Sequence, residues 1–541
     1  MFDSIILNAD IYSLERDGDK FEAMVVDDGR IVKLYEVEPQ NASSIAKEVI
    51  DAEGKTVLPA FTDGHFHFMS SAALQEIALN VSEIEDGVLL PKNLDGFSRK
   101  LKDFADGKAK EKPILCFNYI IASFEEDRLP TWKEIDAWVP GRIVMILSMD
   151  AHSSAYSSRA LKLFGFDPNE HNGILVGEDH EYNMGKINDA ILKFLSTAEI
   201  VKGVQHLCNE AFNYGITCIH CLDGFDDLED DKSLWFLAKF GGSLPIRLRM
   251  FPQVRNISRV EQYRKVMAYP RLGGCGGWEM DGSVGSKTAA FYEPYKNEPE
   301  NRGKLLFPKD KLIDAMVSAQ KKGYQITSHA IGTRAIDVVL EAYSELFSRC
   351  KLESNVQRHR IDHFEFPNEE QVNKAIDDLG LLITAQPGYT WMDDLYQKSY
   401  ERYLNPSQIN RQIPLKTIME KGGCLIGSSD SPVQHLNPFI QLSGMVNFPI
   451  EKEQLNMYQA LQTYTINGAY STFEESIRGT LSVGKHADFI IMRQDPFKVK
   501  KDEVAELSVD ATYINGRRPA RMDKGLFGFF LSSIFKKKRP I

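Results

Sequence analysis

Two histidines, His65 and His67, stand one residue apart at the end of the segment 57–67, which begins as an apolar run. If this segment is a β-strand, residues i and i+2 share one face, so both imidazoles point at the same place. A metal ion requires that arrangement from two ligands on one strand. Because the chain has 12 histidines, chance alone produces such a pair in roughly one chain of this composition in four, and the pattern needs support from elsewhere.

Three further residues supply that support. His329, His363 and Asp430 each stand at or just after the end of an apolar, strand-like run. A (β/α)8 barrel of ~250 residues spends roughly 31 residues on each strand–helix unit. His329 and His363 are 34 residues apart, and Asp430 follows His363 by 67 residues. If His65 and His67 end the first strand, these residues end strands 5, 6 and 8, and the set is suited to a divalent metal.

The elements that must position these side chains alternate along the chain. Strand-like runs such as 142–147 are separated by amphipathic segments such as 309–322. This alternation predicts a parallel α/β architecture, and we expect a (β/α)8 barrel. His67 and His329 are 262 residues apart, far more than four units need, so an insertion is expected within about 75–200.

Both ends of the chain are rich in short strand-like runs and turn signals. We therefore expect residues 1–57 and 476–520 to form one small sheet domain. Residues 58–475 form the barrel with its insertion. The run around His220 is expected to be the third strand of the barrel, and the imidazole of His220 is expected to point to the barrel mouth. Residues 521–541 form an apolar and basic tail.

Composition excludes several classes of protein. The apolar fraction of 43% is sufficient for a large core and excludes general disorder. The net charge of −12 argues against a nucleic-acid partner. The chain has neither an apolar stretch of membrane-spanning length nor a recognisable secretory signal at its start, and its seven cysteines are scattered. The sequence thus predicts a cytoplasmic protein with reduced thiols.

The segment Pro59–His67 resembles the opening motif of the amidohydrolase superfamily. Further segments resemble amidohydrolase family 3, in its YtcJ-like branch: 149–153, 281–289, 328–332, 359–363, 427–433 and 479–489. The resemblance implies a metal-bearing TIM barrel with an insertion and a β-sandwich domain built from both termini. It also implies hydrolysis of an amide or other carbon–nitrogen bond in a small molecule, not of protein peptide bonds.

The residues suggest how this chemistry would proceed. A divalent ion, expected to be one zinc, lowers the pKa of bound water and polarises the substrate carbonyl. Asp430 takes the proton from that water and delivers it to the leaving nitrogen. Either His363 or His152 stabilises the oxyanion. His152 and Glu178 are expected to line the substrate pocket, mainly because of the resemblance and the insertion.

One departure from the family leaves the number of metal ions open. Its members commonly carry a lysine, four residues before the Asp-Gly of the strand-4 motif, that bridges two metals. Here that position is Gly277. Glu279 and Cys275 lie on the same face of the expected strand and are candidate substitutes. A mononuclear site is the simpler expectation, and a second ion is the alternative.

Other functions remain open from the sequence alone. A heterocycle deaminase would normally carry a glutamate three residues after His329, where this chain has Gly332. A catalytically inactive, ligand-binding barrel is the other alternative, although it has no need of Asp430. The apolar stretch 526–535 and the basic residues after it predict a peripheral membrane contact. A docked helix or a contact in a homodimer are the alternatives for this tail.

Overall fold

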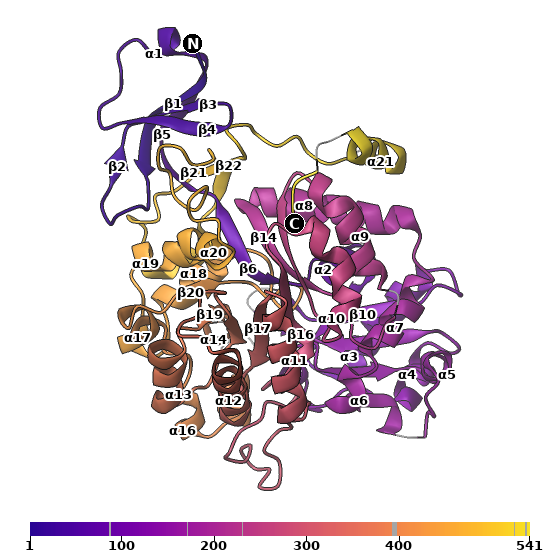
Figure 1. The fold of residues 1–541 in the computed structure, drawn as a ribbon. Coiled ribbons are helices and arrows are strands. Elements are labelled where there is room, and N and C mark those ends of the chain that lie inside the picture. Colours follow the sequence, from indigo (N-terminus) through magenta and orange to yellow (C-terminus); the bar gives the residue numbers. More distant parts are fainter. Residues whose placement is uncertain (86–87, 170, 230, 392–397, 524, 536–537) are drawn as a thin grey trace.

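A computed structural model describes residues 1–541 except 86–87, 170, 230, 392–397, 524 and 536–537. Its centre is a set of parallel strands surrounded by helices (Figure 1). The predicted α/β class is therefore confirmed. In chain order the central strands are β6 (Phe61–Phe66), β14 (Ile216–Asp223), β15 (Arg247–Pro252), β16 (Arg271–Glu279), β17 (Gln325–Ala330), β18 (Arg360–His363), β19 (Leu382–Ala385) and β20 (Leu425–Gly427).

These strands pair in chain order within two hydrogen-bonded sheets, β6-β14-β15 and β16-β17-β18-β19-β20. The sheets meet at both ends. Gly277 N–H donates to Gln253 O over 3.1 Å between β16 and β15, and a parallel bridge joins Phe66 to Ser431, just after β20. Because all the strands are parallel, their carboxyl ends lie together at one edge.

The central strands are buried on both faces, as parallel strands covered by helices must be. The covering helices are α2 (Phe68–Ile77), α8 (Thr197–Asn213), α9 (Lys232–Phe240), α10 (Ile257–Val260), α11 (Lys309–Lys321), α12 (Thr333–Cys350), α13 (Glu369–Asn373), α17 (Leu415–Glu420), α18 (Pro438–Val446), α19 (Met457–Tyr464) and α20 (Ile466–Ser471). Helix α8 is typical of them. A capping box of Ser196 and Glu199 starts it, and its buried face includes Val204 and Leu207.

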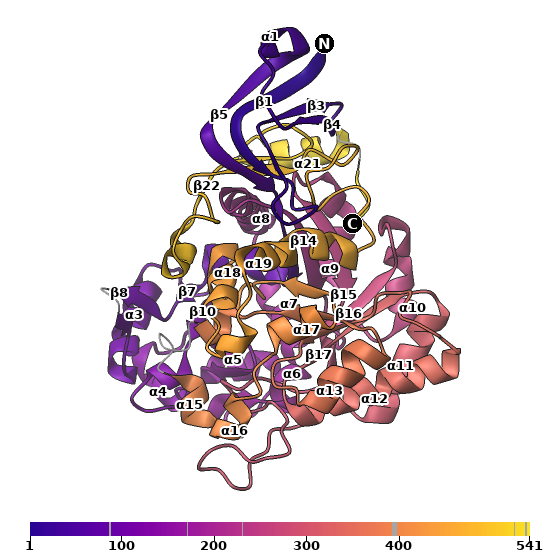
Figure 2. The same ribbon diagram turned by 90° about the vertical axis from the view of Figure 1, so that its left-hand side faces the viewer.

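A separate sheet of order β13-β12-β11-β10-β7 is inserted between β6 and β14 (Figures 1 and 2). Its core contains Phe97, Tyr119 and Ile146. The insertion lies beside the carboxyl ends of the central strands and contributes side chains to the cavity described below. Its elements are β7 (Leu79–Asn80), β8 (Glu83–Glu85), β9 (Val88–Leu90), α3 (Leu94–Asp106), β10 (Ile114–Tyr119), α4 (Trp132–Trp138), β11 (Val144–Ser148), β12 (Ser153–Tyr156), α5 (Ser158–Phe164), β13 (Ile174–Val176), α6 (Glu178–Glu181) and α7 (Met184–Leu192).

Another sheet joins the two ends of the chain, and Figure 1 shows its indigo and yellow strands together. Ile6, Val57 and Phe489 share its buried cluster. The described strands form one seven-stranded sheet, so the second layer of the expected β-sandwich stays a prediction. The strands are β1 (Phe2–Tyr12), β2 (Lys20–Phe21), β3 (Ala23–Asp27), β4 (Arg30–Tyr35), β5 (Ala46–Pro59), β21 (Phe489–Met492) and β22 (Val509–Tyr513), with α1 (Ala42–Ile45) beside them.

The tail carries helix α21 (Leu526–Phe535), which lies near α8 and α9 in Figure 1. Phe529 is buried and contacts the rings of Phe236 and Phe240 on α9. Farther along, Ile541 N–H donates to Val266 O over 2.8 Å. These contacts favour the docked alternative, and membrane contact stays a prediction. Within the described residues, none of the helices is both apolar and long enough to cross a bilayer.

Candidate metal centre and active site

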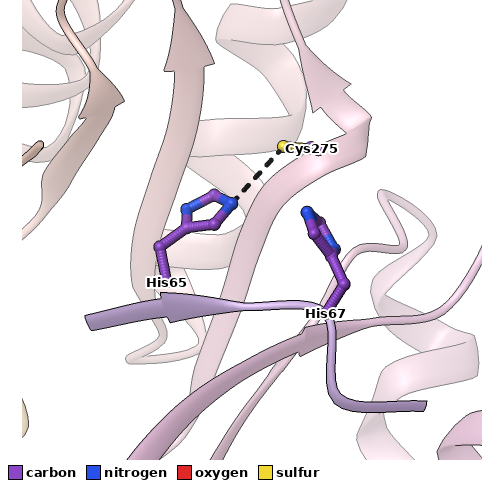
Figure 3. A group of neighbouring side chains, drawn as sticks. All are labelled: His65, His67 and Cys275. Carbon is purple, nitrogen blue, oxygen red and sulfur yellow. Dashed lines mark hydrogen bonds between the residues drawn. The ribbon is translucent and has the colours of Figure 1, made fainter. Parts of the chain in front are cut away.

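The carboxyl ends of the central strands bring together the five residues that the sequence proposed as metal ligands. Asp430 Oδ1 lies 3.2 Å from His65 Nε2 and 3.1 Å from His67 Nε2. The ring centroid of His363 lies 4.4 Å from that of His329 and 5.1 Å from that of His65. Figure 3 shows His65 and His67 rising from the end of one strand toward the same space. The i, i+2 spacing and the strand-end positions therefore produce one cluster.

Each of the four imidazoles has its other ring nitrogen beside an acceptor. The pairs are His65 Nδ1 with Asp362 Oδ2 at 3.3 Å, His67 Nδ1 with Leu222 O at 2.9 Å, His329 Nε2 with Gly282 O at 3.4 Å and His363 Nδ1 with Gln386 Oε1 at 2.9 Å. Such acceptors place the proton on the outer nitrogen and leave the inner lone pair free to bind a metal.

A sulfur atom completes the cluster. Cys275 Sγ lies 3.7 Å from His65 Nε2, 3.6 Å from His329 Nδ1 and 3.9 Å from His363 Nε2. Figure 3 shows its side chain on another strand, β16, facing the two histidines at the end of β6. Gly277, which occupies the family's lysine position, faces elsewhere, because a Cβ there would lie 3.1 Å from the Asp226 Cγ atom.

Asp430 has the features of a functional carboxylate. Its backbone is in the left-handed region, with φ +58°, and so is that of His363, with φ +71°. Non-glycine residues adopt this conformation at a cost, and strained residues of this kind recur at active sites. Tyr389 O–H donates to Asp430 Oδ2 over 2.9 Å. Burial alone would raise the pKa of Asp430, but His65 and His67 hold it well below its ordinary value.

The donor set fits a divalent metal. Asp430 Oδ1 is buried and accepts no hydrogen bond from the described residues. The inner nitrogens of four histidines, one thiol and this oxygen are donors that zinc and related ions bind. Two triads, His65-His67-Cys275 and Cys275-His329-His363, each hold their ligand atoms within 4.8 Å of one another.

His152 lies beside this cluster, on the insertion side. Its Nδ1 is 2.9 Å from Glu181 Oε1 and 3.0 Å from Glu279 Oε1. Burial alone would lower the pKa of His152, but the two carboxylates outweigh it and raise the pKa well above its ordinary value. The ring is therefore an imidazolium at neutral pH, a fixed positive charge at the edge of the cavity.

Glu178, the other residue predicted to line the substrate pocket, is not among the cavity residues. Its Oε2 lies 3.0 Å from Lys304 Nζ, in an ion pair that is partly open to solvent. Glu181, three residues further along α6, lines the cavity. Glu178 differs from the prediction because it pairs with Lys304 at the surface, whereas Glu181 pairs with His152 inside the cavity.

The cavity itself has a volume of about 180 Å³ and two kinds of wall. The polar wall contains members of the cluster and the acidic side chains of Asp150, Glu181, Asp223 and Glu279. The opposite wall comes from α2, α7 and the inserted strands, and its apolar side chains include Leu74, Ile77, Leu115, Met145, Leu147, Met184 and Ile187. A small molecule with an apolar group would fit between the two walls.

Sequence reasoning missed several residues that hold this site. Gln386 and Tyr389 follow β19, and Asp362 precedes His363 on β18. The available signal was position, since polar residues directly after a strand of such a fold face the site. Asp362 is also held ionised, because Arg360 and His65 outweigh burial and lower its pKa.

Comparisons with known proteins agree with this arrangement. A family model described as "Amidohydrolase family" matches residues 48–519. YtcJ of Bacillus subtilis (strain 168), named as a candidate amidohydrolase, is 25% identical over 94% of this chain and 97% of its own length. The N-substituted formamide deformylase of Arthrobacter pascens is 24% identical over 95% of this chain and 98% of its own length.

A solved structure supports the fold. An uncharacterized metal-dependent hydrolase from Pyrococcus horikoshii OT3 matches with a TM-score of 0.70 at 22% identity. The match covers 92% of this chain and 99% of that one. At this identity the likeness shows that the two chains share a fold.

Proposed function

We propose a function for this chain, which belongs to the amidohydrolase family and is a hydrolase acting on carbon–nitrogen bonds. The proposal is that it cleaves an amide or related bond in a small molecule rather than the peptide bonds of proteins. The observation that carries the proposal is the convergence of four imidazoles and Asp430 beside a cavity. We also propose that the central strands close into a (β/α)8 barrel. The hydrogen bond from Gly277 to Gln253 and the bridge from Phe66 to Ser431 support closure at both seams.

The residues that would hold the metal are His65, His67, His329, His363 and Asp430, and zinc is the ion that this donor set favours. A divalent ion supplies a Lewis acid that polarises the substrate carbonyl and makes water nucleophilic near neutral pH. The outer acceptors described above orient the imidazoles and leave the inner nitrogens directed at the common space, as in other histidines that bind metals.

Asp430 would move the proton. Its Oδ1 faces the cluster without a hydrogen bond from the described residues, and Tyr389 holds Oδ2 in place. Because its pKa is depressed, the carboxylate is ionised and ready to accept a proton from the attacking water. Asp430 then delivers that proton to the leaving nitrogen.

We assign the oxyanion role to His152 instead of His363. The Nδ1 atom of His363 is engaged by Gln386, and its Nε2 atom points into the cluster, so neither is free for the substrate. His152 carries a positive charge and lines the cavity. A charge fixed there would stabilise the negative oxygen of the tetrahedral intermediate.

The cavity walls narrow the class of substrate. Of the described residues that line it, none is lysine or arginine, whereas five are aspartate or glutamate. A substrate with its own carboxylate would be repelled, so a neutral or cationic molecule fits best. The apolar wall fits an apolar substituent, and a formamide that carries one on nitrogen has this shape. The relative that is named a formamide deformylase supports the same choice.

The test is hydrolysis by the zinc-loaded protein. Neutral formamides and amides with apolar N-substituents are compared with N-acyl amino acids and with amino-substituted heterocycles. We expect turnover of the first group, loss of turnover with a chelator and recovery with zinc. Ammonia release from heterocycles alone would indicate a deaminase. Tight metal binding without turnover of any group would indicate an inactive ligand-binding barrel.

A further inference from the structure

Cys275 occupies the centre of the metal cluster. Its Sγ atom belongs to two potential ligand triads, the first with His65 and His67 and the second with His329 and His363. We propose that the Cys275 thiolate bridges two divalent metal ions, one in each triad, and does the work of the lysine that this chain lacks. The inference rests on the proposed function only in that a metal occupies this site.

The distances agree with shared coordination. A tetrahedral zinc ion binds thiolate at ~2.3 Å and imidazole nitrogen at ~2.05 Å, which separates the two ligand atoms by about 3.6 Å. Cys275 Sγ lies 3.7 Å from His65 Nε2 and 3.6 Å from His329 Nδ1. These nitrogens belong to different triads. The Cys275 sulfur therefore lies, from each of the two nitrogens, at the distance that a shared zinc ion would impose.

The backbone around Cys275 is shaped to place that sulfur. Gly273, Gly274 and Gly276 have φ values of +111°, +114° and +57°, which favour glycine. A Cβ at Gly273 would lie 2.0 Å from Thr327 O, and one at Gly274 would lie 2.3 Å from a methyl of Leu222. The pairing of β16 with β17 shifts register between Gly274 and Glu279. The glycines thus form an irregular segment that turns Cys275 into the cluster.

The same irregularity explains why Gly277 is not the bridging position. Any side chain at Gly277 would start 2.9 Å from Gln253 O and 3.2 Å from Arg255 Cγ. It would therefore head toward Asp226 and Arg255, which are joined by an ion pair at 2.6 Å. The residue four positions before the Asp-Gly motif faces the cluster only if the strand between them is regular.

Glu279, the other candidate bridge, forms a further potential ligand group with His152 and His329, but both of its oxygens already have partners outside the two triads. Its Oε1 lies 3.0 Å from His152 Nδ1, and its Oε2 accepts a hydrogen bond from Gly276 N–H over 3.2 Å. Charge also favours a thiolate at the centre, because two closely spaced dications repel unless an anion lies between them. Neutral histidines supply no charge, and Asp430 lies beside His65 and His67.

The experiment replaces the native metal with Co²⁺, which reports thiolate ligation by a sulfur-to-cobalt charge-transfer band in the near ultraviolet. The full chain is stripped of metal, titrated with Co²⁺ and analysed for bound metal. We expect two equivalents and the charge-transfer band in the wild type. In Cys275→Ala we expect loss of the band and of at least one equivalent. Cys275→Ser keeps the size of the side chain and should lose the band as well.

Cys350→Ser is the matched control, because Cys350 is a partly exposed thiol at the end of α12, outside the cluster. It should keep both equivalents and the band. Circular dichroism establishes that each variant is folded. If both Cys275 variants misfold, alkylation of wild-type Cys275, mapped by mass spectrometry, decides instead. Zn²⁺ should protect this thiol at least tenfold and leave Cys350 unprotected.

A wild type that binds one equivalent, a Cys275→Ala protein that keeps both, or a Cys275 that Zn²⁺ does not protect would overturn the bridge. These readouts need no substrate. A protein that binds two ions through Cys275 but hydrolyses no amide would contradict the proposed function and leave the bridge intact. A protein that hydrolyses amides with one ion would do the reverse.

Discussion

Two polar clusters lie inside the same set of strands, at opposite ends. At the carboxyl ends, histidines, Cys275 and Asp430 surround a cavity. At the amino ends, Arg249, Arg360 and Glu474 are buried in the strands or packed against them. Both clusters consist of residues that proteins seldom bury without a partner. The comparison between them shows which buried polar groups mark a site.

The arginine cluster is compensated by its own members. Glu474 pairs with Arg249 and, at 2.6 Å, with Arg478. Arg478 NH1 in turn donates to Thr62 Oγ1 on β6 over 2.7 Å. Burial alone would raise the pKa of Glu474, but the two guanidinium groups lower it well below its ordinary value. These contacts join the segment after α20 to the strands and serve stability.

The metal cluster differs in the direction of its donor atoms. Its imidazoles have partners on their outer nitrogens, while the inner nitrogens and Asp430 Oδ1 converge on a common space. The two clusters touch at Asp362, which lies 2.9 Å from Arg360 NH2 and 3.3 Å from His65 Nδ1. Donors that converge on a space beside a cavity indicate a ligand, whereas opposite charges paired with each other indicate stability.

The largest expected effect is on the metal side. Asp430→Asn keeps the size of the side chain but removes the base. We expect turnover on the best substrate to fall by roughly 10² or more, because a positioned proton shuttle contributes ~10²–10⁴. Metal affinity should fall less than in His65→Ala, because an amide oxygen still binds weakly. Near-wild-type turnover in Asp430→Asn would move the proton transfer to another group.

The second effect is on the arginine side. Glu474→Gln leaves Arg249 and Arg478 buried without a counter-ion, and we expect the free energy of unfolding in urea to fall by about 3–5 kcal/mol. Metal bound per folded chain should not change. As a control, Glu341→Gln removes an exposed pair with Lys309 and should cost less than ~1 kcal/mol. Equal losses in both variants would contradict the assigned difference between buried and exposed pairs.

A matched pair of glutamines sharpens the comparison. Gln386 Oε1 lies 2.9 Å from His363 Nδ1 in the metal cluster, and Gln320 Oε1 lies 2.9 Å from His359 Nε2 at the other end. Gln386→Leu should weaken metal binding about 10–100-fold in competition with a chelator, because the ligand histidine loses its orienting partner. Gln320→Leu should leave metal affinity unchanged. If both variants weaken it equally, the outer acceptors have no specific role.

The smallest expected effect is on the pH dependence of stability, through His359. Burial lowers the pKa of His359 from 6.5 to about 3. Between these values the unfolded chain binds a proton that the folded chain does not, so stability falls as the pH drops. The loss approaches about 1.4 kcal/mol per pH unit. Urea unfolding between pH 7 and 5 should show that His359→Gln loses less stability than the wild type. Parallel pH profiles for the two proteins would refute this assignment.

Local sequence determined a large part of this molecule. The alternation of strand-like and helical segments specified the α/β class, because burial on both faces requires continuous apolar strands. The pair His65 and His67 needed only the two-residue period of a strand to point the same way. The spacing of His329, His363 and Asp430 needed only whole strand–helix units. Each of these predictions depends on periodicity within one element or on counting between elements.

Tertiary structure decided what periodicity cannot reach. The positive φ values near Cys275 break the register of β16, so Cys275 faces the cluster while Gly277 faces Asp226. His220 was expected on the third strand, facing the mouth. It lies on β14, the second strand, with Nδ1 3.2 Å from Arg360 NH1. The reason is geometric, because one residue of register moves a side chain to the other face of a strand, and only packing between strands sets that register.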